Sequence, residues 1–406
     1  MTVFVKKPIR ELCTVRREHV VPQANVEYTL YSLPAFDNSQ KPELVDGKDI
    51  KSSKLAVESN IILFNKLNVK FRRVWNVHEM NDENAVCSTE FIPLKANQSI
   101  LQDYLYYNLI SDALTNTMDA ARKGTSCSQQ RIDVDALFSY EISVPPIAVQ
   151  EKIVGILLNI DRKIKQNEAI NHNLQQQAAA LFKEWFIDNP DSSSWREGTF
   201  SNLIERTISG DWGKDSPTNN NTEMVYCIRG ADIPEVRAGN KGKMPIRYIP
   251  PKNFATKRLV DGDIVVEISG GSPTQSTGRA AVVSDSLLAR YDKGMVCTNF
   301  CKALKPIAGF SMYVFYYWQY LYNLGVFFSY ENGTTGIKNL DINGFLETES
   351  INIAPVKLIE KFNTFCQSVN ARVYANGLEN ELLAEIRDMI LPKLMSGEID
   401  VSEVEL

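Results

Sequence analysis

Two long stretches of the chain place apolar residues at alternating steps of four and three, the spacing that keeps one face of an α-helix apolar. Each stretch keeps this spacing over more than four heptads, which predicts a coiled-coil helix. Pro145-Pro146 and Pro355 lie where the helices should begin, and Asn189-Pro190 would end the first. The seam positions are Ile153, Leu157, Ile160, Ile164, Leu174, Ala178, Leu181 and Trp185, then Phe362, Cys366, Val369, Val373, Leu383, Arg387, Ile390 and Leu394.

Two asparagines interrupt each seam at the same place. They are Asn167 and Asn171 in the first helix and Asn376 and Asn380 in the second. A buried asparagine is costly unless it meets a partner, and it then fixes the register of the helices. We therefore expect the two helices to pack on each other. They should run antiparallel, because the chain must return through an intervening globular segment. The alternative is that each helix packs on its own globular part.

The whole chain also repeats itself. Most matches lie 209 positions apart, an offset that falls to 191 near the beginning of each copy and drifts only in variable stretches. We therefore expect two copies, about residues 1–190 and 191–406, each with a globular part followed by a helix. The matched pairs include Phe4 with Trp195, Leu12 with Leu203, Leu94 with Leu304, Pro146 with Pro355, Asn167 with Asn376 and Asn171 with Asn380.

The globular parts have the pattern of mixed α and β structure. Short β-branched or apolar runs predict strands at residues 60–65, 88–94, 263–268, 280–283 and 299–304. Each copy then has an aromatic helix, predicted at residues 100–114 and 311–324. The stretch 309–330 is long enough to suggest a membrane span, but its Gln319, Asn323 and tyrosines favour a buried helix.

Composition narrows the class of protein. The 406 residues suffice for two or three domains, and 44% of them are hydrophobic, which excludes a disordered chain. The net charge of −5 gives no general basic excess, although a local basic face can still bind DNA. Seven scattered cysteines, no CxxC and three histidines give no zinc motif and suggest reduced thiols. With no signal peptide visible, we expect a cytoplasmic protein.

Motifs for catalysis are not found. The run from Gly239 to Met244 lacks the glycine spacing of a P-loop, and Asp191 follows Asn189-Pro190 where an amino-methyltransferase motif needs a second proline. Asp263, Glu267 and Ser269 approach a nuclease spacing, but serine replaces the required lysine. The sequence therefore predicts a binding protein that has no catalytic or metal site.

Basic and amide side chains recur at matched places in both copies. Lysine and arginine neutralise phosphates, and arginine, glutamine and asparagine pair with base edges. A solvated surface explains any single cluster, whereas recurrence in both copies favours DNA contact. Arg122-Lys123 belongs to the first set. The predicted DNA-binding residues are Lys66, Arg72, Arg73, Gln130 and Arg131 in the first copy, and Lys243, Arg247, Lys252, Arg258, Gln275 and Arg279 in the second.

Several of these motifs resemble one family. Residues 145–154 (PPIAVQEKIV), 161–164 (DRKI) and 180–186 (ALFKEWF), with the asparagines between them, are similar to the central repeat of type I restriction-modification specificity subunits. Residues 382–399 (LLAEIRDMILPKLMSGEI) resemble the distal repeat of that family, and residues 31–37 (YSLPAFD) also match family members. The resemblance covers nearly the whole chain, with Phe4 where many copies begin with tryptophan.

The resemblance implies an α+β fold with an internal pseudo-twofold repeat. Two mixed α/β target recognition domains, residues 1–145 and 190–353, would be separated by an antiparallel coiled coil of residues 146–189 and 354–406. Each domain would recognise half of a bipartite site in double-stranded DNA. Two methylation subunits would dock on the helices, and restriction subunits could join them. The chain itself would bind no cofactor; S-adenosylmethionine, ATP and Mg²⁺ are expected on the partner subunits.

Two other functions remain open at this point. One is a non-catalytic scaffold whose coiled coil only bridges protein partners, which a salt-dependent affinity for DNA would argue against. The other is a self-contained nuclease or methyltransferase, which the missing motifs disfavour and which activity of the purified chain would reveal.

Overall fold

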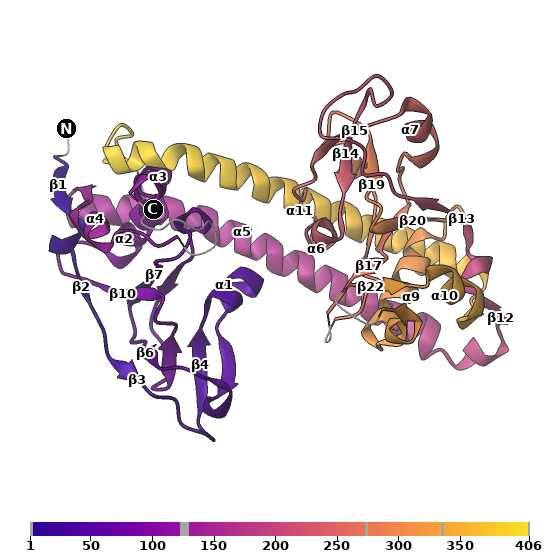
Figure 1. Cartoon of the computed structure of the whole chain (residues 1–406), viewed down its shortest axis with the longest axis horizontal. Coiled ribbons are helices and arrows are strands. Elements are labelled where there is room, and N and C mark those ends of the chain that lie inside the picture. Colours follow the sequence, from indigo (N-terminus) through magenta and orange to yellow (C-terminus); the bar gives the residue numbers. More distant parts are fainter. Residues whose placement is uncertain (1–2, 122–129, 273–274, 334–336, 405–406) are drawn as a thin grey trace. The chain divides into compact units, whose positions relative to one another are not determined.

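The computed structural model describes residues 3–121, 130–272, 275–333 and 337–404 (Figure 1). The chain divides into unit 1, comprising Met1–Arg162 and Ala384–Leu406, and unit 2, Lys163–Leu383. Two long helices, α5 (Ile147–Phe182) and α11 (Val356–Ser396), each give a segment to both units.

The described residues of unit 1 form three sheets. A four-stranded antiparallel sheet has the order β2-β10-β7-β8, a five-stranded sheet has the order β3-β6-β9-β4-β5, and β1 pairs with β11. The strands are β1 (Val5–Pro8), β2 (Cys13–Val15), β3 (His19–Val20), β4 (Glu27–Tyr31), β5 (Glu43–Asp46), β6 (Lys54–Ala56), β7 (Ile61–Asn65), β8 (Val74–Val77), β9 (Ala85–Cys87), β10 (Phe91–Ala96) and β11 (Glu141–Val144). The shorter helices are α1 (Leu33–Ser39), α2 (Gln102–Leu109), α3 (Asp112–Ala120) and α4 (Val134–Ser139).

Unit 2 has four sheets in the part of it that the structure describes. Their orders are β13-β20-β16-β18, β15-β14-β19, β17-β22-β21 and the pair β12-β23. The strands are β12 (Arg196–Thr199), β13 (Ile204–Ser209), β14 (Glu223–Ile228), β15 (Ile246–Ile249), β16 (Ile264–Glu267), β17 (Ser269–Gly270), β18 (Ala280–Val282), β19 (Met295–Cys297), β20 (Cys301–Pro306), β21 (Glu331–Asn332), β22 (Lys338–Leu340) and β23 (Ser350–Ile353). The shorter helices are α6 (Ile233–Arg237), α7 (Pro251–Lys257), α8 (Asp285–Leu288), α9 (Ser311–Asn323) and α10 (Ile342–Thr348).

The two units share one strand plan. The order β2-β10-β7-β8 of unit 1 is repeated as β13-β20-β16-β18 in unit 2. A parallel pair with an antiparallel third strand also occurs in both, as β9-β4-β5 and β19-β14-β15. β20 begins 210 positions after β10, and α11 begins 209 positions after α5, the same offsets that the sequence repeat has. The predicted duplication is therefore present in the fold.

The buried aromatic helix of unit 2 was predicted correctly. α9 lies in the main core of the unit, where Tyr313 and Trp318 are fully enclosed. Among the described residues, no helix combines the length and apolar character needed to cross a membrane. The stretch that suggested a membrane span is thus partly this core helix.

The corresponding prediction for unit 1 was wrong in one respect. The single helix expected at residues 100–114 ends at Leu109, and a second helix, α3, begins at Asp112. Ser111 causes the break, because its extended backbone and its side chain cap α3 by accepting a hydrogen bond from the Leu114 amide. Both helices still contribute buried residues to the core of unit 1.

The end of the first seam also differs from prediction. The expected seam positions Leu181 and Trp185 are only partly buried, and Phe182 and Phe186 are enclosed instead. α5 ends at Phe182 and continues as a π-helical turn over Lys183–Ile187. A π turn, with hydrogen bonds from residue i to i+5, has more residues per turn than an α-helix and so rotates the chain less at each residue. The buried face therefore falls one residue later.

Candidate nucleic-acid interface

In unit 1, a basic corner forms where the end of β7 meets the segment that follows residue 129. The Asn68 amide donates to the Gln130 carbonyl at 3.0 Å, and the Ile132 amide donates to the Lys66 carbonyl at 3.0 Å. The turn before β10 closes the same corner, because the Lys66 amide donates to the Glu90 carbonyl at 2.9 Å. Three residues predicted from separate parts of the sequence are thereby brought together. We call Arg17, Lys66, Glu90, Gln130 and Arg131 corner one.

Corner one carries an excess of positive charge. Arg131 Nη2 lies 2.6 Å from Glu90 Oε1, and Lys66 Nζ donates to the Thr89 carbonyl at 2.6 Å. Desolvation lowers the pKa of Lys66, Glu90 opposes this, and the nearby charges of Arg131 and Arg17 lower it further. The charges of Lys66, Arg131 and Arg17 thus outnumber the single carboxylate of corner one, an arrangement that attracts phosphate. Arg17 was missed in the sequence, although the Arg16-Arg17 pair signalled it.

Arg72 and Arg73 are not part of this excess. Arg73 makes two 2.6 Å hydrogen bonds to the Asp37 carboxylate, and its guanidinium lies 4.5 Å from the centre of the Phe71 ring. Arg72 is bonded to Asp112 and has the left-handed backbone that closes the turn after β7. Carboxylates therefore compensate both charges, and DNA contact by these arginines stays a prediction.

Unit 2 has a corner at the equivalent place. β17, just after β16, pairs with β22 through Ser269 and Asn339, and the Ile268 amide donates to the Phe300 carbonyl at 2.9 Å. Gly270 and Gly271 have positive φ values of 145° and 75°, backbone conformations that glycine adopts readily because it has no Cβ. We call Ser269, Gln275, Arg279, Phe300, Lys338 and Asn339 corner two.

Corner two differs from corner one in charge. Arg279 makes a two-pronged ion pair with Glu267 at 2.7 and 2.6 Å, and Lys338 lies 2.8 Å from Glu331. The Phe300 side chain is 59% exposed at the tip of a hydrogen-bonded turn. This corner therefore presents an aromatic ring, the exposed Gln275 and backbone amides with little net charge. Sequence reasoning missed Phe300, because its exposure follows from the turn alone.

The remaining predicted residues of unit 2 lie apart from corner two. Arg247 is 6% exposed, with its guanidinium 4.0 Å from the centre of the Trp212 ring and its Nε donating to the Trp212 carbonyl at 2.8 Å. It holds the loop before β14 against β15. Lys243, Lys252 and Arg258 are exposed, and within the described part of the chain no ion pair engages them. Their DNA contact stays a prediction, and the predicted pair Arg122-Lys123 lies outside the described residues.

The four asparagines of the seams meet in unit 2. Asn167 Nδ2 donates to Asn380 Oδ1 at 2.9 Å, and Asn376 Nδ2 donates to Asn171 Oδ1 at 2.8 Å. Asn171 also donates to the Val373 carbonyl at 3.0 Å. Because residue numbers rise along α5 as they fall along α11, the two segments run antiparallel within this unit. All four side chains are buried, so each bond replaces water lost on folding.

The helix segments of unit 1 pack differently. Leu157 of α5 and Leu394 of α11 are buried in one apolar core, and Arg387 Nη1 donates to Asp161 Oδ1 at 2.8 Å. α11 also leaves apolar side chains exposed. These are Ile386 and Met389 in unit 1, and Leu378 and Leu382 in unit 2.

Comparisons with known proteins identify this architecture. Residues 4–176 match the family model of the type I restriction modification DNA specificity domain. The chain is 25% identical to the specificity subunit of the type I restriction enzyme HindI of Haemophilus influenzae, over 88% of this chain and 90% of that protein. It is 23% identical to the MjaIX specificity subunit of Methanocaldococcus jannaschii, over 77% and 74%.

A solved structure supports the fold. The crystal structure of a type I restriction-modification S subunit from M. genitalium covers 97% of this chain and 96% of its own, with a TM-score of 0.53. Its sequence identity to this chain is 16%, so the likeness concerns the fold alone.

Proposed function

We propose that this chain is a member of the type I restriction-modification DNA specificity family, whose model its residues 4–176 match, and that each of its units recognises one half of a bipartite site in double-stranded DNA. The observation that carries the proposal is the repeated corner. The same strand plan brings polar side chains to the same edge in both units, whereas the side chains themselves differ. A shared scaffold with different side chains is what recognition of two different half-sites requires.

In this proposal, the two corners contact different parts of the DNA. Corner one binds phosphate through Lys66, Arg131 and Arg17, and Gln130 reaches a base edge. Corner two contributes less charge, and its Phe300 ring and Gln275 amide contact bases. The exposed Lys252 and Arg258 of unit 2 add phosphate contacts there.

The long helices set the distance between the half-sites in this proposal. The target recognition domains are residues 1–145 and 190–353, and α5 with α11 forms the coiled-coil spacer. The four buried asparagines fix its register. Half-sites about 34–36 Å apart lie on one face of B-DNA, so a fixed spacer lets the second half bind without a further search.

Partner subunits supply the chemistry. Two methylation subunits dock on the exposed apolar residues of α11, with S-adenosylmethionine as their cofactor. Restriction subunits with ATP and Mg²⁺ complete a nuclease in the cytoplasm. The chain by itself is a non-catalytic specificity subunit.

A direct experiment compares genomic adenine-methylation motifs in cells with and without this chain. We expect a motif of two defined halves to disappear with the chain, and Arg131→Ala to relax positions in one half only. Lys51→Ala, an exposed lysine outside corner one, is the control and should leave the motif unchanged. A motif that persists without the chain, or relaxes in both halves together, would contradict the proposal.

A second experiment addresses the spacer. Four residues inserted into each long helix add about 6 Å of helix. We expect the unspecified bases between the half-sites to change by one or two base pairs, at about 3.4 Å per base pair. An unchanged motif in a well-folded insertion variant would refute the role of the helices as a ruler.

A further inference from the structure

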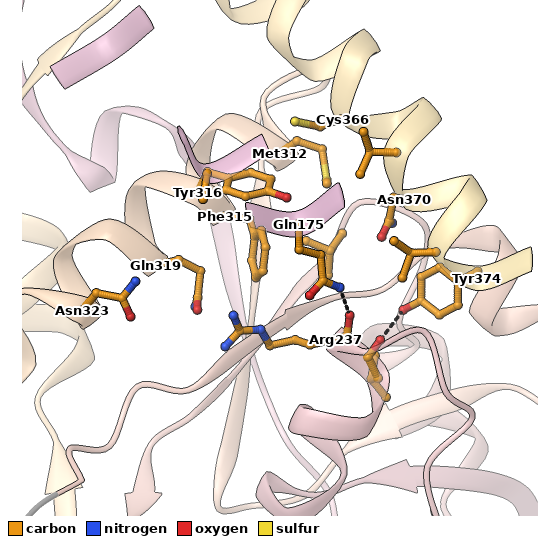
Figure 2. Close-up of a pocket in the computed structure, with 15 residues that line it drawn as sticks. Gln175, Arg237, Met312, Phe315, Tyr316, Gln319, Asn323, Cys366, Asn370 and Tyr374 are labelled. Atoms are coloured by element: carbon orange, nitrogen blue, oxygen red, sulfur yellow. Dashed lines mark hydrogen bonds between the residues drawn. The ribbon is translucent and has the colours of Figure 1, made fainter. Parts of the chain in front are cut away.

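Unit 2 contains a pocket enclosed by helices α5, α6, α9 and α11 (Figure 2). It leaves about 90 Å³ for the centres of water-sized molecules, and a second cavity of about 310 Å³ adjoins it through Gln175 and Arg237. The residues at the junction are held in place, because Gln175 Nε2 donates to the Arg237 carbonyl and Tyr374 Oη donates to the Val236 carbonyl at 3.2 Å. We call the joined cavities the Arg237 pocket.

The charge of the Arg237 pocket is one-sided. No aspartate or glutamate is among the residues that line either cavity. Within the described residues, the Arg237 guanidinium has no ion pair and donates no hydrogen bond, and it lies 6.0 Å from the centre of the Phe315 ring. Arg237 is exposed as a residue. Nearby side chains still desolvate its guanidinium, which lowers the pKa of Arg237, and Tyr316 and Tyr322 oppose this shift. An accessible guanidinium without a counter-ion, beside aromatic side chains, can bind an oxyanion from solvent through two of its N–H groups.

A second side chain points to a missing ligand. Gln319 is 6% exposed, and its Nε2 is enclosed without any hydrogen-bond acceptor. Native proteins rarely leave a buried amide donor unpaired. Gln319 lies beside Arg237 in the pocket wall (Figure 2). Rotation about the last torsion of glutamine is broad, so its NH₂ group can turn toward an oxygen held by Arg237.

We propose that the Arg237 pocket binds a phosphate-type oxyanion, held by the Arg237 guanidinium and the Gln319 amide. The space suits a tetrahedral anion with a few waters, and the inner cavity is too small for a nucleobase. The anion has two possible sources, a backbone phosphate of bound DNA or a free phosphate or nucleotide. The DNA source rests on the proposed function, because Gln275 and Arg279 of corner two also line the outer cavity. The free source is independent of it.

The first test uses the full chain without DNA. Inorganic phosphate and AMP are titrated by calorimetry into the wild type, Arg237→Gln, Arg237→Lys and Gln319→Leu, with chloride as the reference anion. We expect phosphate binding to weaken about tenfold or more in Arg237→Gln, and less in Arg237→Lys, which keeps the charge but loses the planar fork. Arg196→Gln is the control, because Arg196 is exposed in unit 2 and lies outside the pocket.

The second test asks whether DNA supplies the phosphate. The affinity of the full chain for a duplex is measured over a series of salt concentrations. If a backbone phosphate occupies the pocket, Arg237→Gln reduces the magnitude of the slope of log K against log salt by about one, and Arg196→Gln does not. Phosphate binding with an unchanged slope assigns the pocket to a free anion. The proposal is overturned if the Arg237→Gln variant melts at the same temperature as the wild type and keeps both its phosphate affinity and its salt slope. If the wild-type chain does not bind the duplex at all, the result counts against the proposed function instead.

Discussion

Corner one and corner two occupy the same place in the same strand plan, yet they offer opposite chemistry. In corner one, Arg17, Lys66 and Arg131 outnumber the single carboxylate of Glu90. In corner two, each cation has its own carboxylate, and an exposed phenylalanine stands where corner one has Glu90. The comparison teaches that backbone pairing fixes where a recognition surface lies, whereas side chains on that backbone decide what it recognises.

The prediction with the largest expected effect concerns whether the two units unfold independently of each other. Trp318 is fully buried in unit 2, its ring lies 4.5 Å from that of Phe327, and its Nε1 donates to the Gly278 carbonyl at 2.7 Å. We expect Trp318→Ala to cost about 3–5 kcal/mol of the stability of unit 2. Hydrogen exchange should show faster opening of unit 2 while the amides of β7 and β10 keep their protection. Equal loss of protection in both units would show that they unfold together.

The next test contrasts the helix segments of the two units. Asn171→Ala leaves the Asn376 amide unpaired and should cost about 1–3 kcal/mol. The double change Asn171→Leu with Asn376→Leu removes both polar groups, so most of the stability should return. The check is chemical denaturation of both variants and of the wild type. If the asparagines fix the register of the helices, the methylation motif of the double variant should contain more than one spacer length. A motif with a single spacer length would show that the asparagines contribute to packing and do not set the register.

Corner one should respond to loss of charge. Arg131→Ala should weaken DNA binding by about 1–3 kcal/mol and flatten the salt dependence. The measurement is fluorescence anisotropy with labelled duplexes at several salt concentrations. Lys51→Ala serves as the matched control in the same unit. An Arg131→Ala variant with wild-type affinity and slope would remove corner one from the interface.

Corner two should respond to loss of an apolar ring. We expect Phe300→Ala to weaken binding by about 1 kcal/mol, at the lower end of what stacking on a base contributes, with the salt slope unchanged. Phe300→Tyr keeps the ring and should bind like the wild type. If Phe300→Ala instead changed the slope, the distinction between the two corners would fail.

Much of the architecture was predictable because it follows from short-range periodicity. The seams placed α5 and α11 within a few residues, and the offset between copies anticipated the repeated strands β10 and β20. Apolar runs also predicted β7, β16 and β18 closely. The breaks at Ser111 and at the π turn after Phe182 were missed, because a cap and a wider turn are decided by local bonds that periodicity does not record.

The sequence by itself determined the two helices, the duplication and the positions of the paired asparagines. Each of these follows from residues that recur at a regular spacing along the chain. Only the tertiary structure decided which basic residues act together. It joined Lys66 to Arg131 across a sheet edge and gave Arg72, Arg73, Arg247 and Arg279 carboxylate or aromatic partners. Among the described residues it left Arg237 without a carboxylate partner, near the Phe315 ring. The physical reason is that a charge acts through its distance to other charges and through its burial, and long-range strand pairing sets both.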